Sequence, residues 1–321
     1  MRVLVTGGLG VNGCWATRRF VSEAHTVAVL DRRLDTAPLG SDAGSVTLFE
    51  ADITNEARLT EVFERFQPEV VVHMAALVGA REARELFDVN AGATVQLLDV
   101  ARRTDVRRVV FTSSRAVYGD LLGVEGHPTY QPVTESTPFA PVRAYDVAKI
   151  AAEGMGQIYR RRYGLEFTAL RFASIFGPGK NVRHAGTSIY SSMIDTAAAG
   201  EPVRIERGGD QRDDVIYVED VAAAIVLAAT VPGPLSPAYN ISRGEGTTLH
   251  DLARAIRTSI PNADIHIGPG LDYFDLGVQY YSVLDNSLAR RELGFEPRYD
   301  LTRGVARYLE ASRSLLETDS A

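Results

Sequence analysis

The sequence predicts an α/β fold, a doubly wound parallel sheet followed by a smaller C-terminal lobe. Two observations predict it. Through the first half of the chain, short runs rich in β-branched residues alternate with longer helical patterns, as in sheets built from right-handed β–α–β crossovers. After about residue 172 the texture changes, and Gly- and Pro-rich stretches such as "FGPGK" and "VPGPLSP" divide the chain into shorter elements.

The predicted elements follow one another in a regular order. The runs expected to form strands lie at 2–6, 25–31, 46–52, 69–75 and 107–114. They are apolar nearly throughout, which is typical of parallel strands covered on both faces. Helical patterns lie between them, at 56–66 and 88–103, and a further helix (145–163) and strand (165–171) extend the alternation.

Composition excludes several classes of protein. The net charge of 34 − 41 = −7 argues against nucleic acid or an anionic membrane as the main partner. The most apolar run, 221–230, has about half the length of a membrane span. Cys14 is the only cysteine, so no internal disulfide can form, and a cytoplasmic location is expected. The six histidines are scattered without metal-ligand spacing, and no metal site is expected.

A glycine triplet follows the first predicted strand. Gly7, Gly10 and Gly13 lie in "VLVTGGLGVNG" at the mouth of a helix, where glycine lets the backbone approach a pyrophosphate at the positive end of the helix. Asp31 ends the second strand, where a carboxylate would hydrogen-bond an adenosine ribose. This pattern predicts a bound dinucleotide. Asp31 favours NAD because a carboxylate repels a ribose 2′-phosphate. Arg32 or Arg33, which follow it, could turn inward to hold that phosphate, which leaves NADP as an alternative.

The chain resembles the extended short-chain dehydrogenase/reductase family, which includes nucleotide-sugar epimerases, dehydratases and related dehydrogenases. The resemblance spans almost the whole chain and rests on "TGGLGVNG", Asp31, "ADI", "HMAA", "VN", "SSRAVYG", "YDVAK", "RFASIFGPG", "RDDVIYVEDVA" and "YNIS". The cofactor-binding residues that it implies are Gly7, Gly10, Val11, Asn12, Gly13, Asp31, Arg32, Asp52, Ile53, Ala75, Ala76, Asn90, Tyr145 and Lys149.

By the same resemblance, Ser114, Tyr145 and Lys149 form a catalytic triad. Tyr145 and Lys149 are four positions apart and share one helix face. A free tyrosine titrates near 10, and an ammonium about 4 Å away would lower that pKa by up to about three units. A positive nicotinamide ring acts in the same direction. Tyr145 would then take a proton from a substrate hydroxyl while a hydride leaves the same carbon, with Ser114 bonding the oxygen.

The residues after Ser114 narrow the expected reaction. In this family, 4,6-dehydratases and decarboxylases carry an acidic residue just before "VYG", where this chain has Arg115 and Ala116. Oxidation of a secondary alcohol remains. The favoured interpretation is a nucleotide-sugar epimerase, in which the oxidised carbon is reduced again in the same site. The alternative is an NAD(P)-dependent dehydrogenase or reductase of a small free sugar, sugar acid or hydroxy acid, in which the oxidation or reduction is net. A third alternative, a non-catalytic NAD(P)-binding regulator, is disfavoured by the intact triad.

The substrate side carries the least specific signals. "GGDQRDDVIYVEDVA" resembles the segment whose arginine binds diphosphate in sugar epimerases, which would make Arg212 that ligand; the alternative is a surface ion pair with Asp213 or Asp214. Ser174 replaces the usual asparagine, and 76–90 is shorter than in most nucleotide-sugar epimerases, which favours the dehydrogenase alternative. The expected substrate-binding residues are Ser114, Arg115, Ser174, Lys180, Arg183 and Arg212.

We expect three regions along the chain. Residues 1–171 would form a dinucleotide-binding Rossmann domain that carries the catalytic residues, and 172–314 a mainly substrate-binding lobe with some segments returning to the first domain. Residues 315–321 would be a tail. The helical segments 88–103 and 145–163 carry apolar and small residues around more than one face, and a homodimer paired through these two helices is expected, as in the family.

Overall fold

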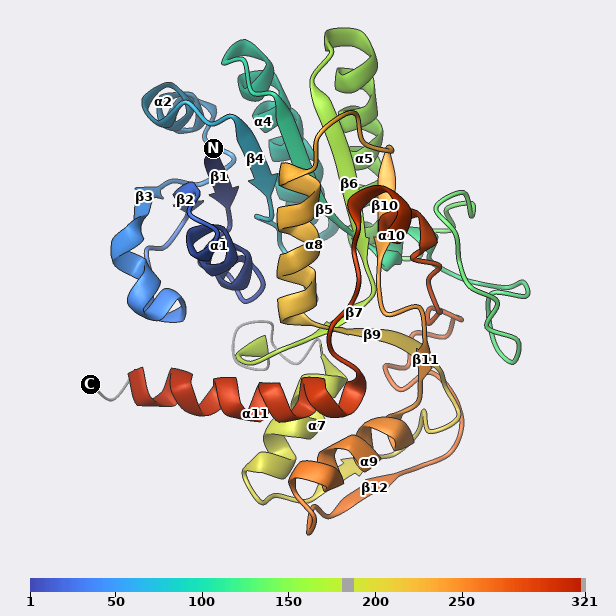
Figure 1. Cartoon of the computed structure of the whole chain (residues 1–321). Coiled ribbons are helices and arrows are strands. Elements are labelled where there is room, and N and C mark those ends of the chain that lie inside the picture. The colour runs from blue at the N-terminus through green and yellow to red at the C-terminus, as the bar shows by residue number, and fades with distance from the viewer. Residues whose placement is uncertain (181–187, 319–321) are drawn as a thin grey trace.

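The computed structural model describes residues 1–180 and 188–318. Within these ranges the main sheet has seven strands, in the order β10-β6-β5-β4-β1-β2-β3, and all neighbouring pairs are parallel (Figure 1). Winding begins at the central β1 and reverses direction between β3 and β4, so the predicted doubly wound sheet is confirmed. The strands are β1 (Arg2–Thr6), β2 (Thr26–Asp31), β3 (Val46–Glu50), β4 (Val70–His73), β5 (Arg108–Ser114), β6 (Glu166–Phe172) and β10 (Ala238–Ile241).

Helices cover both faces of this sheet. Successive residues of β1 face opposite sides: Val3 and Val5 pack in one hydrophobic cluster, and Leu4 in another. The first cluster includes residues of α1 (Gly13–Ser22) and α8 (Val218–Thr230). The second includes residues of α2 (Glu56–Phe66), α4 (Ala93–Arg103) and α5 (Ala144–Tyr163). This two-sided burial explains why the strand sequences are apolar without alternation.

One predicted helix begins earlier than its pattern indicated. The segment expected to be helical from 88 is preceded by α3 (Ala83–Phe87) and enters α4 through a single π turn, Asp88–Gly92. Asn90 in this turn is buried, and its side chain exchanges two hydrogen bonds with the backbone of Leu77 in the loop after β4. A tertiary contact therefore accompanies the π turn. Single π turns of this kind are frequently found at functional sites.

The C-terminal half forms a smaller lobe at one edge of the sheet (Figure 1). It contains two small sheets. One is formed by β7 (Ser174–Phe176), β9 (Asp213–Tyr217) and β11 (Gly246–Thr247), and the other by β8 (Val203–Ile205) and β12 (Ile265–Ile267). Its helices are α7 (Ile189–Ala198), α9 (Leu249–Ser259), α10 (Ser287–Leu293) and α11 (Leu301–Thr318). β10 and α8 leave this lobe, β10 to pair with β6 and α8 to pack against α1.

The described helices include none that is long and apolar enough to cross a membrane. The carboxyl ends of β1, β2, β4 and β5 all face the lobe formed by β7, β9 and the segment after β12 (Figure 1). In doubly wound sheets, ligands bind outside the carboxyl ends of the strands, at the point where the strand order reverses. The fold therefore places the candidate site between the main sheet and the smaller lobe.

Candidate active site

The glycine loop between β1 and α1 forms one end of the site. Gly7 has φ +70°, and a Cβ atom there would lie 2.8 Å from the Cα of Ala75. A Cβ on Gly13 would lie 2.1 Å from the carbonyl oxygen of Gly7. Both positions therefore require glycine. The first turn of α1 holds no acidic residue, so none of its own side chains opposes the positive end of the helix.

The loop also holds a polar atom without a protein partner. The side-chain oxygen of Asn12, at the start of α1, is buried and has no hydrogen-bond partner among the described residues. A buried acceptor of this kind is costly unless a ligand or water satisfies it. Together with the room left by Gly7 and Gly13, it fits a dinucleotide whose pyrophosphate and ribose lie across the loop.

The predicted adenosine-side residues surround this loop. Asp31 ends β2, and its Oδ2 accepts a hydrogen bond of 3.2 Å from the backbone N–H of Leu9, so the carboxylate is turned toward the loop. Arg32 follows it and is exposed. Asp52 accepts bonds from the backbone and hydroxyl of Thr54, which lower the pKa of Asp52. The side chain of Asn90 hydrogen-bonds the backbone of Leu77, and it therefore supports the loop after β4.

A single cavity of about 1390 Å³ joins the glycine loop to the smaller lobe. Its walls include most of the residues predicted for the cofactor, the reaction and the substrate. The predicted residues in its lining are Gly7, Gly10, Val11, Asn12, Gly13, Asp31, Arg32, Asp52, Ile53, Ala75, Ala76, Ser114, Arg115, Tyr145, Lys149, Ser174 and Lys180. The described part of the chain contains no group of three or more His, Cys, Asp or Glu side chains that could hold a metal ion.

The three proposed catalytic residues all line this cavity. Ser114 is the last residue of β5, and its Oγ accepts a bond of 3.1 Å from the backbone N–H of Ala116. Tyr145 lies in the first turn of α5, one residue before Asp146, whose carboxylate caps that turn by accepting from the backbone of Arg143. Ser114 lies close enough to Tyr145 to lower the pKa of its phenol. The hydroxyl pair is therefore fixed by a strand end and a helix start.

The expected pKa of Tyr145 was wrong. Burial raises it to about 12, while the charge of Arg143 and the nearby Ser114 hydroxyl oppose this rise. Lys149 Nζ donates to the carbonyl oxygen of Thr112 at 2.7 Å and lies 5.7 Å from the centre of the Tyr145 ring. Burial lowers the pKa of Lys149 to about 7, against the charge of Glu153. In the protein alone, desolvation therefore outweighs the attraction between the two groups.

The predicted substrate residues have different locations. Ser174 and Lys180 line the cavity, and burial lowers the pKa of Lys180 to about 8. Arg212 is exposed, and its side chain is absent from the cavity lining among the described residues. Asp213 forms an ion pair with Arg115 instead. Arg183 lies outside the described residues.

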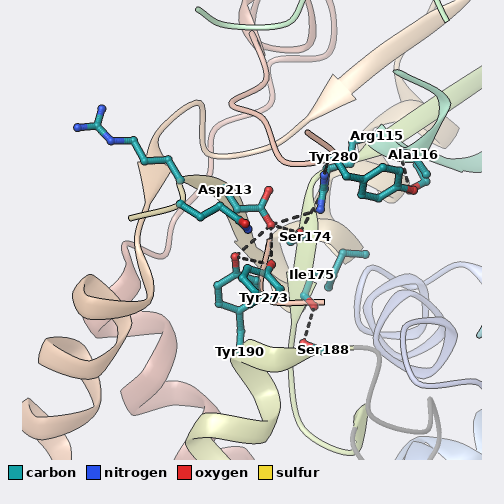
Figure 2. A network of polar contacts seen from close by, with 12 residues as sticks. Arg115, Ala116, Ser174, Ile175, Ser188, Tyr190, Asp213, Tyr273 and Tyr280 are labelled. Atoms are coloured by element: carbon teal, nitrogen blue, oxygen red, sulfur yellow. Dashed lines mark hydrogen bonds and ion pairs between the residues drawn. The ribbon is translucent and has the colours of Figure 1, made fainter. Parts of the chain in front are cut away.

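Arg115 belongs to a buried polar network that the sequence did not indicate. Figure 2 shows Arg115, Ser174, Tyr190 and Tyr273 gathered around Asp213. Other cavity residues that sequence reasoning missed are Arg143, Phe274, Leu276, Tyr280 and Tyr281. The tyrosines of "YFDLGVQYY" (273–281) are the one signal that could have marked this segment.

Comparison with known proteins adds independent evidence. The family model of the NAD dependent epimerase/dehydratase family matches residues 3–242. A UDP-glucose 4-epimerase of Mycolicibacterium smegmatis is 30% identical over 322 residues, which cover 98% of this chain and 99% of that protein. A UDP-glucose 4-epimerase of Thermotoga maritima, solved with UDP-glucose, has a TM-score of 0.86 and 27% identity, covering 98% of this chain and all of the other. A Thermus thermophilus UDP-glucose 4-epimerase, solved with NAD, has a TM-score of 0.81 and 27% identity, covering 98% and 99%.

Proposed function

The chain belongs to the NAD-dependent epimerase/dehydratase family, and on this premise we propose that it is an NAD-dependent epimerase of a nucleotide sugar. One observation carries the proposal: Ser114, Tyr145 and Lys149 line the same cavity as the glycine loop and residues of the smaller lobe. A cofactor at one end and a sugar at the other would therefore meet at these side chains.

The residues present suit NAD. Its pyrophosphate would lie over the glycine loop, the hydroxyls of its adenosine ribose at Asp31, and its nicotinamide ribose at Tyr145 and Lys149. When bound, NAD supplies a hydride acceptor that can return the hydride to either face of the same carbon. The direction of Asp31 toward the loop, with Arg32 exposed, supports NAD rather than NADP.

The chain's own residues would manage the proton. Tyr145 Oη takes the proton of the substrate hydroxyl as the carbon is oxidised to a ketone, and gives it back when the ketone is reduced with the opposite configuration. Ser114 Oγ donates to the same substrate oxygen and holds it beside the phenol. Arg143 supplies positive charge near the phenol, which favours its ionised form against the effect of burial.

The acidic residues of the cavity argue against elimination. Within the described part of the chain, the carboxylates that line it are Asp31, Asp35, Asp52 and Glu85. The first three follow β2 and β3 at the cofactor end, and Glu85 belongs to α3. Asp213, near Ser114, is bound to Arg115. A dehydratase needs an acid or base at the carbon next to the ketone, and this site offers none there, so epimerisation is the better-supported reaction.

The diphosphate of the substrate needs cations. Lys180 and Arg143 line the cavity on the substrate side, and we propose them as its ligands. Arg183 and Arg212, predicted from the sequence, stay proposals for the same role, and the exposed position of Arg212 is the observation that favours the second candidate function, net oxidation of a small sugar acid or hydroxy acid. We further propose that the enzyme works in a reducing, cytoplasmic setting, since its sole cysteine, Cys14, is buried, donates from Sγ to the carbonyl oxygen of Val11, and has no second cysteine with which to form an internal disulfide.

Thermal shift with nucleotides alone tests this proposal. If the substrate is a nucleotide sugar, saturating UDP or dTDP should raise the Tm, because a ligand that binds only the folded state stabilises it. Lys180→Met and Arg212→Ala, measured separately, identify the cation that holds the diphosphate, and the NAD-induced shift serves as the control in each variant. No shift of the wild-type protein with either nucleotide would contradict the nucleotide-sugar substrate and favour the small acid.

A further inference from the structure

A buried carboxylate gathers four donors at the substrate end of the cavity (Figure 2). Asp213 in β9 is 1% exposed. Its Oδ2 accepts hydrogen bonds from Ser174 Oγ at 2.5 Å, Tyr190 OH at 3.0 Å, Tyr273 OH at 3.4 Å and Arg115 Nη2 at 3.4 Å. These donors belong to four separate parts of the chain, so Asp213 joins the end of β5 to β7, α7 and the segment after β12.

Arg115 is the only cation among these donors, and its charged side chain is buried. It follows Ser114 directly, and its side chain is 9% exposed. Nε donates to Ser174 Oγ at 3.3 Å, and Nη1 donates to the backbone carbonyl of Tyr280. The guanidinium carbon lies 5.2 Å from the centre of the Tyr280 ring and 5.1 Å from that of Tyr281, within the range of cation–π attraction.

The charge of Arg115 is already used by the protein. Asp213 balances it, and three different groups accept its hydrogen bonds. A guanidinium paired in this way is poorly suited to hold a second anion such as a phosphate. Its contacts instead connect the end of the strand that carries Ser114 to the backbone carbonyl of Tyr280 and to the rings of Tyr280 and Tyr281. Arg115 is thus placed to orient other groups rather than to bind substrate charge.

The segment that Arg115 contacts, residues 273–281, forms an aromatic wall of the cavity. We use "tyrosine wall" for the cavity-lining residues of segment 273–281: Tyr273, Phe274, Leu276, Tyr280 and Tyr281. Tyr280 and Tyr281 are buried and pack against Ala116 with Tyr145 alongside. Tyr273, Phe274 and Leu276 are more open to the cavity. The tyrosine wall therefore lines the same cavity as the Ser114 and Tyr145 hydroxyls, at which the reaction would occur.

The wall is also tied to the catalytic helix. The hydroxyl of Tyr280 donates to Asp146 Oδ1 at 3.0 Å, next to Tyr145 in α5. The whole segment lies beyond residue 242, where the match to the family model ends.

We propose that Arg115 is a positioning residue that, with Asp213, holds the tyrosine wall against the Ser114 end of the cavity, and that the wall determines which sugar the enzyme accepts. The reacting sugar ring packs its apolar C–H face on Tyr273, Phe274 and Leu276, which exclude water from the carbon being oxidised. This assignment rests on the proposed function for the identity of the substrate as a sugar, but the anchoring of the wall does not.

Amide hydrogen exchange tests the anchoring without any substrate. The double variant Arg115→Met with Asp213→Asn removes both charges, so that no buried ion is left unpaired. We expect exchange within 273–281 to become faster, while exchange in the glycine loop and the NAD-induced rise in Tm stay at wild-type levels. Unchanged exchange within 273–281 would overturn the anchoring.

A second buried pair on the same strand provides the matched control. Arg108 begins β5, is fully buried, bonds Glu166 at 2.7 Å and donates to the carbonyls of Ala228 and Val231 at the end of α8. The double variant Arg108→Met with Glu166→Gln should lower the Tm without changing exchange in 273–281. Equal acceleration in both double variants would mean that the effect is global destabilisation, and would also overturn the proposal.

Kinetics of Arg115→Lys test the effect on substrate. Lysine keeps the charge beside Asp213 and so protects the fold, but it cannot direct bonds to Ser174, Tyr280 and Asp213 at once. We expect KM for the nucleotide sugar to rise about tenfold or more with a smaller change in kcat. A wild-type KM in a folded variant would overturn the role of the wall in substrate choice. If wild-type protein turns over no nucleotide sugar, the proposed function fails, and the exchange result still decides the anchoring.

Discussion

At the scale of single residues, Tyr145 is the group on which the proposed chemistry depends. Tyr145→Phe removes the proton-carrying hydroxyl and keeps the ring that packs beside the tyrosine wall. We expect kcat to fall by about two to four decades, the usual contribution of general acid–base catalysis. The NAD-induced rise in Tm should persist, because the phenyl ring still fills the same space. Near wild-type turnover in this variant would remove Tyr145 from the mechanism.

Asp31 is the residue that should select the cofactor. Asp31→Ala removes the carboxylate that faces the glycine loop, so NAD binding should weaken and NADP binding should improve relative to it. Arg32→Ala tests the NADP alternative, because it removes the neighbouring cation that could hold a ribose 2′-phosphate and should weaken NADP binding more than NAD binding. Titration of both cofactors measures this. Tighter NADP than NAD binding by the wild-type protein would contradict the role given to Asp31.

Lys149 should make stability depend on pH. Burial lowers its pKa from 10.5 to about 7, against the charge of Glu153. Between these values the unfolded chain binds a proton that the folded chain has released, so the free energy of unfolding rises with pH across this window. Lys149→Met removes this contribution.

Urea unfolding measures the effect in wild type and Lys149→Met. From about pH 7 to pH 9, the wild type should gain stability relative to the variant, by an amount on the order of 1 kcal/mol per pH unit. A difference between the two proteins that does not change with pH would show that Lys149 titrates normally.

At the scale of elements, regular patterns were predicted well and tertiary turns were not. The strand at 2–6 and the helix at 56–66 have the bounds that their apolar periods indicated, because local propensity and burial agree there. The segment before 88 was missed as helix. Its π turn depends on Asn90 bonding Leu77, a contact that no periodicity encodes.

The candidate site divides in the same way. The glycine loop and Asp31 follow strand ends, so their meeting at one sheet edge could be predicted from the order of elements. The tyrosine wall has no periodic pattern, and its partner Tyr190 comes from α7, far away in sequence. The pKa of Tyr145 was misjudged because spacing along a helix places two residues on one face without fixing where the lysine ammonium points.

Helix α5 carries the surface for the expected homodimer. Val147, Ile158 and Tyr163 on this helix are each more than 40% exposed, as is Phe87 at the end of α3. Large apolar side chains left exposed suggest a partner, and an isologous contact would pair α4 and α5 with their copies. Light scattering at micromolar concentration should give twice the chain mass of 34.9 kDa.

Charge placed on that face should separate the subunits. Ile158→Glu is expected to shift the mass toward a single chain, whereas Leu122→Glu, at an apolar residue that is exposed in a loop, should leave the dimer intact. A wild-type protein that is monomeric throughout the micromolar range would rule out pairing through α5.

At the scale of the whole molecule, function depends on one cavity shared by two structural parts. The main sheet supplies the glycine loop, Asp31 and Ser114, and the smaller lobe supplies Lys180 and the tyrosine wall. Because α5 contributes Tyr145 and also contacts the wall through Asp146, the reacting centre lies where the two parts join. A sugar bound there can be oxidised and reduced without leaving the cavity, which is what an epimerase requires.

The most direct test of this account is to incubate purified protein with NAD and a UDP-hexose and to separate the sugar nucleotides over time, while NADH absorbance is followed in the same sample. We predict that the hexose converts to its epimer until the two reach equilibrium, with no net accumulation of NADH, and that Tyr145→Phe abolishes the conversion. Steady NADH production from a free sugar acid or hydroxy acid, with UDP- and dTDP-hexoses left unchanged, would contradict the account.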